Sequence, residues 1–285
     1  MSQIAYVNGA YVGRQEGAVS IEDRGYQFAD GIYEVIYIVD GKLIDEERHL
    51  ARLERSLNEL RIDKPMEFKP LSLVMRELIR RNYLREGFLY MQITRGVARR
   101  DHAFPAHATP VLTMTVNRSK IPSYDEIIKG VKVITVPDIR WKRRDIKSIS
   151  LLPNCLCKQE AREAGAYEAW QVDEEGFVTE GTSSNAWIVT TDNELVTRKA
   201  DYNILNGITR LAVLDAVADE GVRFVERPFT VEEAYAAKEA FVTSTISFVK
   251  PIHTIDDKTI GDGKIGAVSD LLLKDYFKHL NAGAA

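Results

Sequence analysis

The sequence predicts an α+β fold with two domains, and three observations support this prediction. Strand-like and helix-like segments alternate along the 285 residues without an internal repeat. Two strand pairs near the N-terminus are each joined by a two-residue turn, which is typical of an antiparallel sheet. A polar stretch at residues 118–125 then interrupts the pattern. We therefore expect a smaller domain at residues 1–120 and a larger one at residues 121–285.

The smaller domain is expected to begin with two hairpins. Asn8-Gly9 separates two apolar segments within residues 4–12, and Asp40-Gly41 does the same within residues 32–44. These turn residues tolerate the positive φ that a two-residue hairpin turn requires. Leucines at helical spacing predict helices, because they give each helix one apolar face. The other elements expected here are strands at residues 88–94 and 111–116 and helices at about residues 50–60 and 71–79.

The larger domain is expected to mix short strands with helices. Thr230 and Glu233 form a capping-box pattern, which predicts the start of a helix. Ile265 and Val268 begin the apolar face of a last helix, which continues to Tyr276. The other expected elements are strands at residues 131–136, 168–172, 186–189 and 194–196 and helices at about residues 155–164, 208–219 and 230–238.

Composition and charge argue against several classes of protein. The 38 basic and 42 acidic residues give a net charge of -4 and are mixed along the chain, so no basic stripe is available to a nucleic acid. No apolar run is long enough to cross a bilayer, and the N-terminus lacks a charged segment followed by an apolar run. Cys155 and Cys157 are too close together for a disulfide framework or a common zinc site. We expect a cytoplasmic globular protein without a nucleic-acid, membrane or metal partner.

A cationic segment follows the strand expected at residues 131–136. Residues 138–147 hold five cations, and such a run usually forms a solvated face. Lys147 differs from the others because Ile146 and Ile149 flank it and an apolar pair follows. Apolar and cationic neighbours disfavour its charged form, which leaves more free amine to attack a carbonyl. Lys147 is therefore a candidate for imine formation, and the alternative is a lysine that simply reaches solvent.

Three further segments offer groups to a charged ligand. Glu180 is followed by small hydroxyl and amide residues up to Asn185, which form either an ordinary turn or a site for a cationic heterocycle and an anion. The helix expected after Gly207 has a start suited to phosphate, and residues 243–245 add hydroxyl groups at a strand end. The sequence lacks a Gly-x-Ser-x-Gly elbow around these serines, which argues against a serine hydrolase.

Five segments, taken in this order, resemble the D-amino-acid aminotransferases. They are Glu22–Glu34, Asp145–Ser148, Thr179–Asn185, Gly207–Arg210 and Phe241–Thr245. The similarity covers nearly the whole chain and extends to the group that also holds branched-chain aminotransferases and aminodeoxychorismate lyases. The resemblance implies pyridoxal 5'-phosphate (PLP) as the cofactor and fold type IV, with a smaller N-terminal α/β domain and a larger C-terminal domain with a barrel-like β core. It also implies a homodimer in which loops of one subunit complete the site of the other.

The resemblance further implies roles for individual residues. Lys147 would carry PLP as a Schiff base and move a proton between the substrate Cα and the cofactor, while Glu180 would keep the pyridine nitrogen protonated. The other residues expected to bind the cofactor, several of them at its phosphate, are Arg52, Ser184, Ile208, Thr209, Ser244 and Thr245. The residues expected to fix the substrate α-carboxylate, and with it the handedness of the reaction, are Tyr33, Arg100 and His102.

The resulting hypothesis is a ping-pong aminotransferase. A D-amino acid such as D-alanine would give up its amino group, and a 2-oxo acid such as 2-oxoglutarate would receive it. The alternatives are a branched-chain or R-amine aminotransferase, an aminodeoxychorismate lyase, and a PLP-binding protein without turnover. Arg100 and His102 favour the D-amino-acid branch, and the adjacent Arg99 leaves open which guanidinium binds the carboxylate. Ala29 and Thr182 stand where the resembling enzymes commonly have glycine and serine.

Overall fold

A computed structural model describes residues 3–284 of the chain. The contacts divide the chain into two compact units. Unit 1 comprises the described residues up to Ile121, together with Ile146–Ser150 and the residues from Leu280 onward. Unit 2 comprises Pro122–Asp145 and Leu151–His279. The domain boundary expected after residue 120 concerns parts that fold independently, and it stays a prediction.

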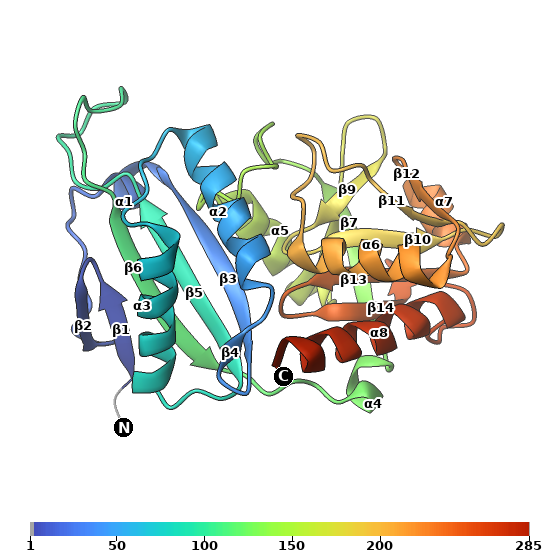
Figure 1. Ribbon diagram of the computed structural model, residues 1–285. Coiled ribbons are helices and arrows are strands. Elements are labelled where there is room, and N and C mark those ends of the chain that lie inside the picture. The colour runs from blue at the N-terminus through green and yellow to red at the C-terminus, as the bar shows by residue number, and fades with distance from the viewer. Residues whose placement is uncertain (1–2, 285) are drawn as a thin grey trace. The chain divides into compact units, whose positions relative to one another are not determined.

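Unit 1 is built on an antiparallel sheet of six strands in the order β2-β1-β6-β5-β3-β4 (Figure 1). The strands are β1 (Ile4–Val7), β2 (Ala10–Gly13), β3 (Gly31–Val39), β4 (Lys42–Leu43), β5 (Gly87–Thr94) and β6 (Val111–Arg118). Both expected hairpins are confirmed, because β1 pairs with β2 and β3 with β4. Their turn residues have positive φ, at 42° for Asn8, 103° for Gly9, 49° for Asp40 and 80° for Gly41.

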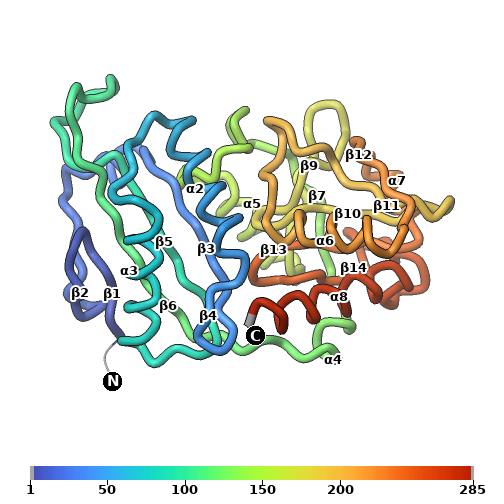
Figure 2. The backbone as a smooth tube through the Cα atoms, viewed as in Figure 1, coloured from blue at the N-terminus to red at the C-terminus, as the bar shows by residue number. Residues whose placement is uncertain are grey.

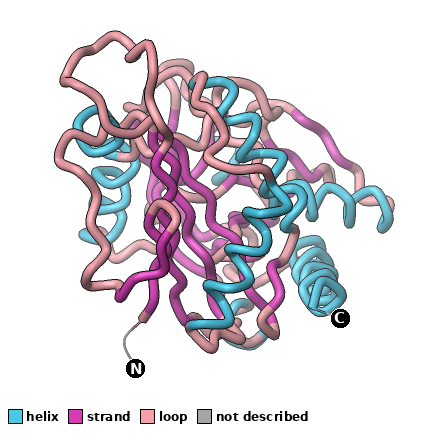
Figure 3. Tube along the Cα trace, turned by 60° about the vertical axis from the view of Figure 1, so that its left-hand side comes forward, coloured by secondary structure: helices cyan, strands magenta, loops and turns pink. Residues whose placement is uncertain are grey.

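Apolar side chains hold two helices against this sheet. The helices of unit 1 are α1 (Arg24–Phe28), α2 (Glu46–Leu60) and α3 (Phe68–Arg81). Leu53 and Leu57 of α2 and Leu78 of α3 are almost fully buried, in one cluster with Ile36 and Ile38 of β3. Each such side chain contributes about 1.5–3 kcal/mol when it leaves water. The loop between β5 and β6 projects beyond the sheet (Figure 2), and Figure 3 shows the same projection from another side.

A short segment from the middle of the chain adds to the β3 side of unit 1. The backbone N–H of Tyr33 donates to the carbonyl of Lys147 at 3.0 Å, and that of Ile149 donates to the carbonyl of Gly31 at 3.0 Å. Ile32 and Ser148 form an antiparallel bridge between these two bonds. A Cβ atom at Gly31 would lie 2.6 Å from the Ile93 carbonyl oxygen. Glycine is therefore needed at the point where this segment meets β3.

Unit 2 is built on a mixed sheet whose main path runs β12-β11-β10-β13-β14-β7-β8-β9, with β15 paired to β14. The strands are β7 (Val131–Pro137), β8 (Glu168–Val172), β9 (Val178–Gly181), β10 (Asn185–Val189), β11 (Leu195–Thr197), β12 (Phe224–Glu226), β13 (Glu239–Ser244), β14 (Phe248–Ile255) and β15 (Lys258–Thr259). The end strand β9 contacts β10 near the other end, so the sheet curls into a half-barrel. The expectation of a barrel-like β core is confirmed.

The helices of unit 2 agree with the sequence in position more than in their ends. They are α4 (Tyr124–Ile127), α5 (Leu152–Glu163), α6 (Ile208–Glu220), α7 (Val231–Ala236) and α8 (Ala267–Ala284). The capping box of Thr230 and Glu233 at the start of α7 is confirmed. Placing Ile265 in the last helix was wrong, because a turn with Gly263 at φ 79° precedes α8. Within residues 3–284, no helix is both long and apolar enough to cross a membrane.

Candidate active site

Lys147 lies beside Tyr33 in unit 1. Its Nζ atom is 4.3 Å from the centre of the Tyr33 ring, and its backbone is fixed to β3 by the pairing described above. The Tyr33 ring stacks on Tyr90 of the neighbouring strand β5, with ring centres 5.8 Å apart. Burial raises the pKa of Tyr90 to about 12, so its hydroxyl stays protonated at neutral pH. The primary amine of Lys147 therefore lies against the Tyr33 ring, and strand pairing fixes the backbone on both sides of this contact.

Arg52, His49 and Glu34 form a buried ionic group in unit 1. His49 and Arg52 are three residues apart on α2, so their side chains leave the same face of the helix. Arg52 donates from Nε and Nη2 to the two oxygens of Glu34, each at 2.8 Å, and His49 Nδ1 lies 2.8 Å from Oε2. Burial works against ionisation of Glu34, but Arg52 and His49 outweigh it and hold the pKa of this carboxyl well below its usual range.

His49 is the neutral member of this group. Burial is the largest influence on the ring and lowers the pKa of His49, although Glu34 works in the opposite direction. An ionised carboxylate can only accept, so Nδ1 carries the proton and donates to Glu34. The group as a whole therefore holds one cation and one anion, with Arg52 in a fixed bidentate geometry.

Arg100 and His102 lie in the projecting loop between β5 and β6. Both side chains are exposed in the single chain. The guanidinium carbon of Arg100 is 4.7 Å from the centre of the Phe28 ring, and the His102 ring centre is 5.6 Å from it. The structure therefore brings these two predicted residues together at α1, whereas Tyr33 packs against Tyr90.

Glu180 is the next-to-last residue of β9 in unit 2 and is buried. Its Oε1 atom accepts from Nη1 of Arg140, while Oε2 accepts from Asn185 Nδ2 at 3.0 Å and from the Leu205 backbone N–H at 3.1 Å. Arg140 is itself held by Asp138, with Nη2 donating at 2.8 Å. A carboxylate is thereby fixed at the end of a strand by one cation and two neutral donors.

Burial and neighbouring charges act in opposite directions on the pKa values of Glu180, Arg140 and Asp138. Burial raises the pKa of Glu180 above its usual value, and Arg140 works in the other direction. Burial would lower the pKa of Arg140, but the carboxylates of Glu180 and Asp138 outweigh it and raise that pKa. Asp138 is held below its usual pKa, because bonds from Arg140 overcome the effect of its own burial. A second cation beside Glu180 would therefore favour its ionised form.

Ser184 points its hydroxyl at a different carboxylate. Its Oγ atom donates to Oε2 of Glu168 at 3.1 Å, and the Ser183 hydroxyl donates to the same atom at 3.0 Å. Thr182 donates to the other Glu168 oxygen. The hydroxyl run that the sequence suggested as an anion site thus surrounds a buried anion of the protein itself. The expected role of Ser184 toward a cofactor stays a prediction.

The start of α6 has no side-chain cap. Gly207 is the N-cap, with φ -65°, and it gives no side-chain hydrogen bond to the first turn that holds Ile208 and Thr209. A Cβ atom at Gly207 would lie 2.2 Å from Asn185 Oδ1, so only glycine fits beside the amide that also bonds Glu180. Uncapped N–H groups at a helix start favour a phosphate.

The strand end after β13 supplies two further hydroxyl groups in unit 2. Ser244 is the last residue of β13, and its Oγ atom accepts from the Ser247 backbone N–H at 3.0 Å. Thr245 follows in the turn that leads to β14. Both side chains are partly exposed, as an anion contact requires.

Each unit, taken by itself, holds donors that suit groups found in PLP. Unit 1 supplies the amine of Lys147 and the guanidinium of Arg52. Unit 2 supplies the buried carboxylate of Glu180 and the uncapped start of α6 at Gly207. An aldehyde, a phosphate and a basic ring nitrogen are the groups that such donors match.

Sequence reasoning missed the residues that hold the predicted ones. Arg140 was interpreted as one cation among five, and its ion pair with Glu180 of β9 is visible only in the structure. Glu34 and His49 were not singled out, although His49 precedes Arg52 at helical spacing, which was an available signal. Glu168 carried no signal, because its partners lie 14 to 16 residues away in the hydroxyl run.

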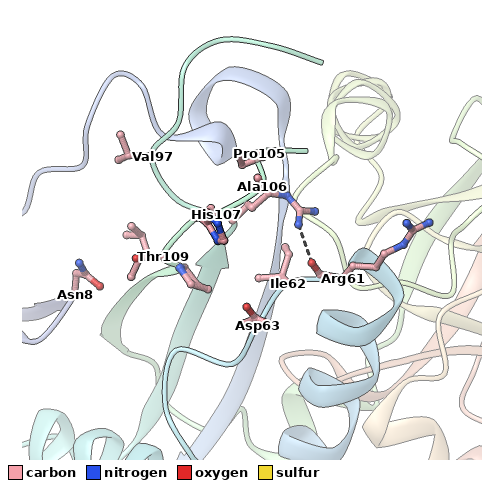
Figure 4. A pocket seen from close by; sticks show the side chains of 13 residues that line it. Asn8, Arg61, Ile62, Asp63, Val97, Pro105, Ala106, His107 and Thr109 are labelled. Atoms are coloured by element: carbon pink, nitrogen blue, oxygen red, sulfur yellow. Dashed lines mark hydrogen bonds between the residues drawn. The ribbon is translucent and has the colours of Figure 1, made fainter. Parts of the chain in front are cut away.

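A polar pocket of about 600 Å³ lies elsewhere in unit 1 (Figure 4). Asn8, Asp63, His107 and Thr109 are among the residues that line it. Of the described residues that form its wall, none is expected to bind cofactor or substrate. The predicted site is therefore not this pocket.

Comparison with known proteins gives consistent matches. The amino-transferase class IV family matches residues 31–255. The D-alanine aminotransferase of Staphylococcus haemolyticus is 41% identical over 277 residues, which cover 97% of this chain and 98% of that protein. The D-alanine aminotransferase of Bacillus licheniformis is 44% identical over 262 residues, which cover 92% of each chain.

A solved structure is also similar over nearly its full length. The branched-chain aminotransferase of the thermophilic archaeon Thermoproteus uzoniensis, solved with norvaline, matches with a TM-score of 0.86 and 25% identity. The match covers 99% of this chain and 96% of that chain.

Proposed function

This chain belongs to the amino-transferase class IV family, and we propose that it transfers the amino group of D-amino acids such as D-alanine to a 2-oxo acid such as 2-oxoglutarate, with PLP as its cofactor. The observation that carries the reaction type is the Lys147 amine at the Tyr33 ring, on a backbone paired with β3. The choice of D-amino acids is supported by two D-alanine aminotransferases at 41% and 44% identity.

We propose that Lys147, Glu180 and Arg52 are among the residues that hold the cofactor. Lys147 binds its aldehyde, and Glu180 accepts from its ring nitrogen. Arg52 and the start of α6 at Ile208 and Thr209 hold its phosphate. Ser184, Ser244 and Thr245 are proposed as further contacts, and the uncapped start of α6 supports this arrangement. When bound, PLP supplies a sink for the electrons released at the substrate Cα.

Two residues of the protein have separate roles in the proposed reaction: Lys147 transfers protons, and Glu180 holds the ring nitrogen. The Lys147 amine takes the proton from Cα and later returns one, so it serves as base and acid in both half-reactions. Glu180 must stay ionised to hold a protonated ring nitrogen. Because burial raises the pKa of Glu180, the Arg140 cation is what keeps it charged.

Arg100 and His102 are proposed to bind the substrate α-carboxylate together with Tyr33. A guanidinium and an imidazole offer three or more donors to one carboxylate, which fixes its position and so the face of Cα turned to Lys147. Both side chains are exposed in the single chain, and this supports a homodimer in which the loop serves the site of the partner. Arg99 is the nearest alternative to Arg100.

The test is an absorbance measurement on the purified protein with PLP. We expect the cofactor band to fall on addition of D-alanine, to persist with L-alanine, and to return with 2-oxoglutarate. A band that responds to L-amino acids alone would favour the branched-chain alternative and overturn the roles of Arg100 and His102. A protein that takes up no PLP would overturn the proposed function, and one that binds PLP without responding to any donor would be a binding protein.

A further inference from the structure

Arg24 is a buried guanidinium that holds the backbone of the loop between β5 and β6. The residue is 3% exposed. Its Nη1 atom donates to the carbonyl oxygens of Asp101 at 2.6 Å and Ala103 at 3.3 Å, and Nη2 donates to that of His102 at 3.5 Å. Three consecutive carbonyl groups therefore face one side chain whose donors form a rigid planar fork.

Asp30 ties Arg24 to a second buried guanidinium. Its Oδ2 atom accepts from Nε of Arg24 at 2.8 Å and from Nε of Arg95 at 2.7 Å, and Oδ1 accepts from Nη2 of Arg95 at 3.0 Å. Arg95 also donates to the carbonyls of Leu60 at 2.7 Å and Arg61 at 2.8 Å. Two buried cations thus share one carboxylate, and backbone carbonyls offset the remaining charge. Since an uncompensated buried charge is costly, both guanidinia hold their carbonyls firmly.

Phe28 connects Arg24 with the side chains of the loop. The guanidinium carbons of Arg24 and Arg100 each lie 4.7 Å from the centre of its ring. The His102 ring centre lies 5.6 Å from it. An aromatic face attracts a nearby cation, so the Phe28 ring favours one orientation of Arg100. Backbone and side chain of the loop are thereby tied to the same short helix.

We propose that Arg24 is a positioning residue for the substrate carboxylate, because it fixes the loop that carries Arg100 and His102. This inference rests on the proposed function, in which those two side chains bind the α-carboxylate. Lysine at position 24 would keep a charge beside Asp30, but a single ammonium cannot span three carbonyl groups. The loop would then move, and carboxylate binding would weaken while the chemistry at Lys147 stayed intact.

The experiment compares Arg24→Lys with Arg14→Lys in the PLP-loaded enzyme. Arg14 is an exposed arginine that also donates to a backbone carbonyl, that of Val116 at 3.3 Å, but it does not contact the loop. For Arg24→Lys we expect KM for D-alanine and the inhibition constant of propionate to rise together by about 10- to 100-fold. The maximal rate should change by less than about threefold, and the cofactor band should stay in place. Arg14→Lys should leave all four unchanged.

Limited trypsin digestion adds a readout that does not depend on turnover. Cleavage after Arg99 and Arg100, followed by mass spectrometry, should be at least about tenfold faster in Arg24→Lys than in Arg14→Lys. Unchanged KM, unchanged propionate inhibition and unchanged cleavage in a folded Arg24→Lys enzyme would overturn the positioning role. If this variant does not fold, Phe28→Leu is the second test, with an expected rise in KM of about 3- to 10-fold and no rise as the contrary result.

Arg100→Ala separates this inference from the proposed function. If Arg100→Ala raises both constants and Arg24→Lys does not, the carboxylate site stands and the positioning role fails. If Arg100→Ala itself leaves KM for D-alanine and propionate inhibition unchanged, the proposed carboxylate site fails, and the positioning role fails with it.

Discussion

Lys147 and Tyr33 are joined at two levels, by a backbone hydrogen bond of 3.0 Å and by an amine that lies 4.3 Å from the ring centre. The backbone bond fixes the main chain of Lys147, and the Tyr33 ring restricts the position of its Nζ atom. The backbone bond and the ring contact together orient the amine. This arrangement makes Lys147 the first position to test.

Replacing Lys147 by alanine should lower the transamination rate by about 10²- to 10⁴-fold, because the proposed acid and base is lost. Borohydride reduction of the PLP-loaded wild type, followed by peptide mapping, should find the cofactor on Lys147. Lys142→Ala is the matched control, since Lys142 is an exposed cation of the same segment and should be dispensable. Cofactor found on another lysine would contradict the assignment.

Replacing Glu180 by glutamine should lower the maximal rate by about 10²- to 10³-fold, because a neutral amide cannot hold a protonated ring nitrogen. PLP should still bind, since the amine and the phosphate contacts remain. Steady-state kinetics and a cofactor titration would measure the two effects separately. Glu174→Gln, at an exposed carboxylate of the turn before β9, is the control and should match the wild type. A fully active Glu180→Gln enzyme would exclude the proposed role.

Replacing His49 by asparagine should flatten the dependence of stability on pH. Because burial lowers the pKa of His49, the unfolded chain takes up a proton at this residue near pH 6.5, while the folded chain does so only at a lower pH. The wild type should therefore lose up to about 1.4 kcal/mol per pH unit from this residue as the pH falls toward 5. Asparagine keeps an amide donor for Glu34 and has nothing to protonate. Urea unfolding at several pH values tests this, and parallel slopes would count against it.

Replacing Gly207 by alanine should weaken cofactor binding by about tenfold or more, because the added Cβ would lie 2.2 Å from Asn185 Oδ1. Asn185 would have to move, and its bond to Glu180 would move with it. Spectroscopic titration of the cofactor-free enzyme with PLP would measure the loss. Gly17→Ala, where the nearest atoms are at an ordinary 3.5 Å, serves as the control. Equal affinity in both variants would refute the close fit.

The sequence was most informative where structure is local. The hairpins at Asn8-Gly9 and Asp40-Gly41 follow from two adjacent residues, and the start of α7 follows from a pattern four residues long. Ile265 was misplaced because its apolar spacing matches that of the last helix. Gly261 and Gly263 have positive φ and form a turn just before it, so α8 begins only at Ala267. Helix ends depend on such backbone details more than on periodicity.

The sequence predicted the main residues of the site but not the residues that hold them in position. Lys147, Glu180 and Arg52 came from ordered motifs. The contacts of Arg140 with Glu180, of Glu34 with Arg52 and of Arg24 with the loop carbonyls instead join residues 18 to 79 positions apart. Such pairings depend on the tertiary fold, and no local pattern announces them. Long-range ion pairs are also where burial changes charge most, so these residues decide the electrostatics of the site.

Unit 1 takes its residues from three separate stretches of the chain, and this has a consequence for biosynthesis. A growing polypeptide folds from its N-terminus, yet the segment Ile146–Ser150 that carries Lys147 and the buried Leu280 both belong to unit 1. The unit therefore cannot be finished until about 280 residues have been translated. A gene fragment that ends at Ile121 would encode a sheet without its lysine, so the two units cannot be expressed separately as working halves.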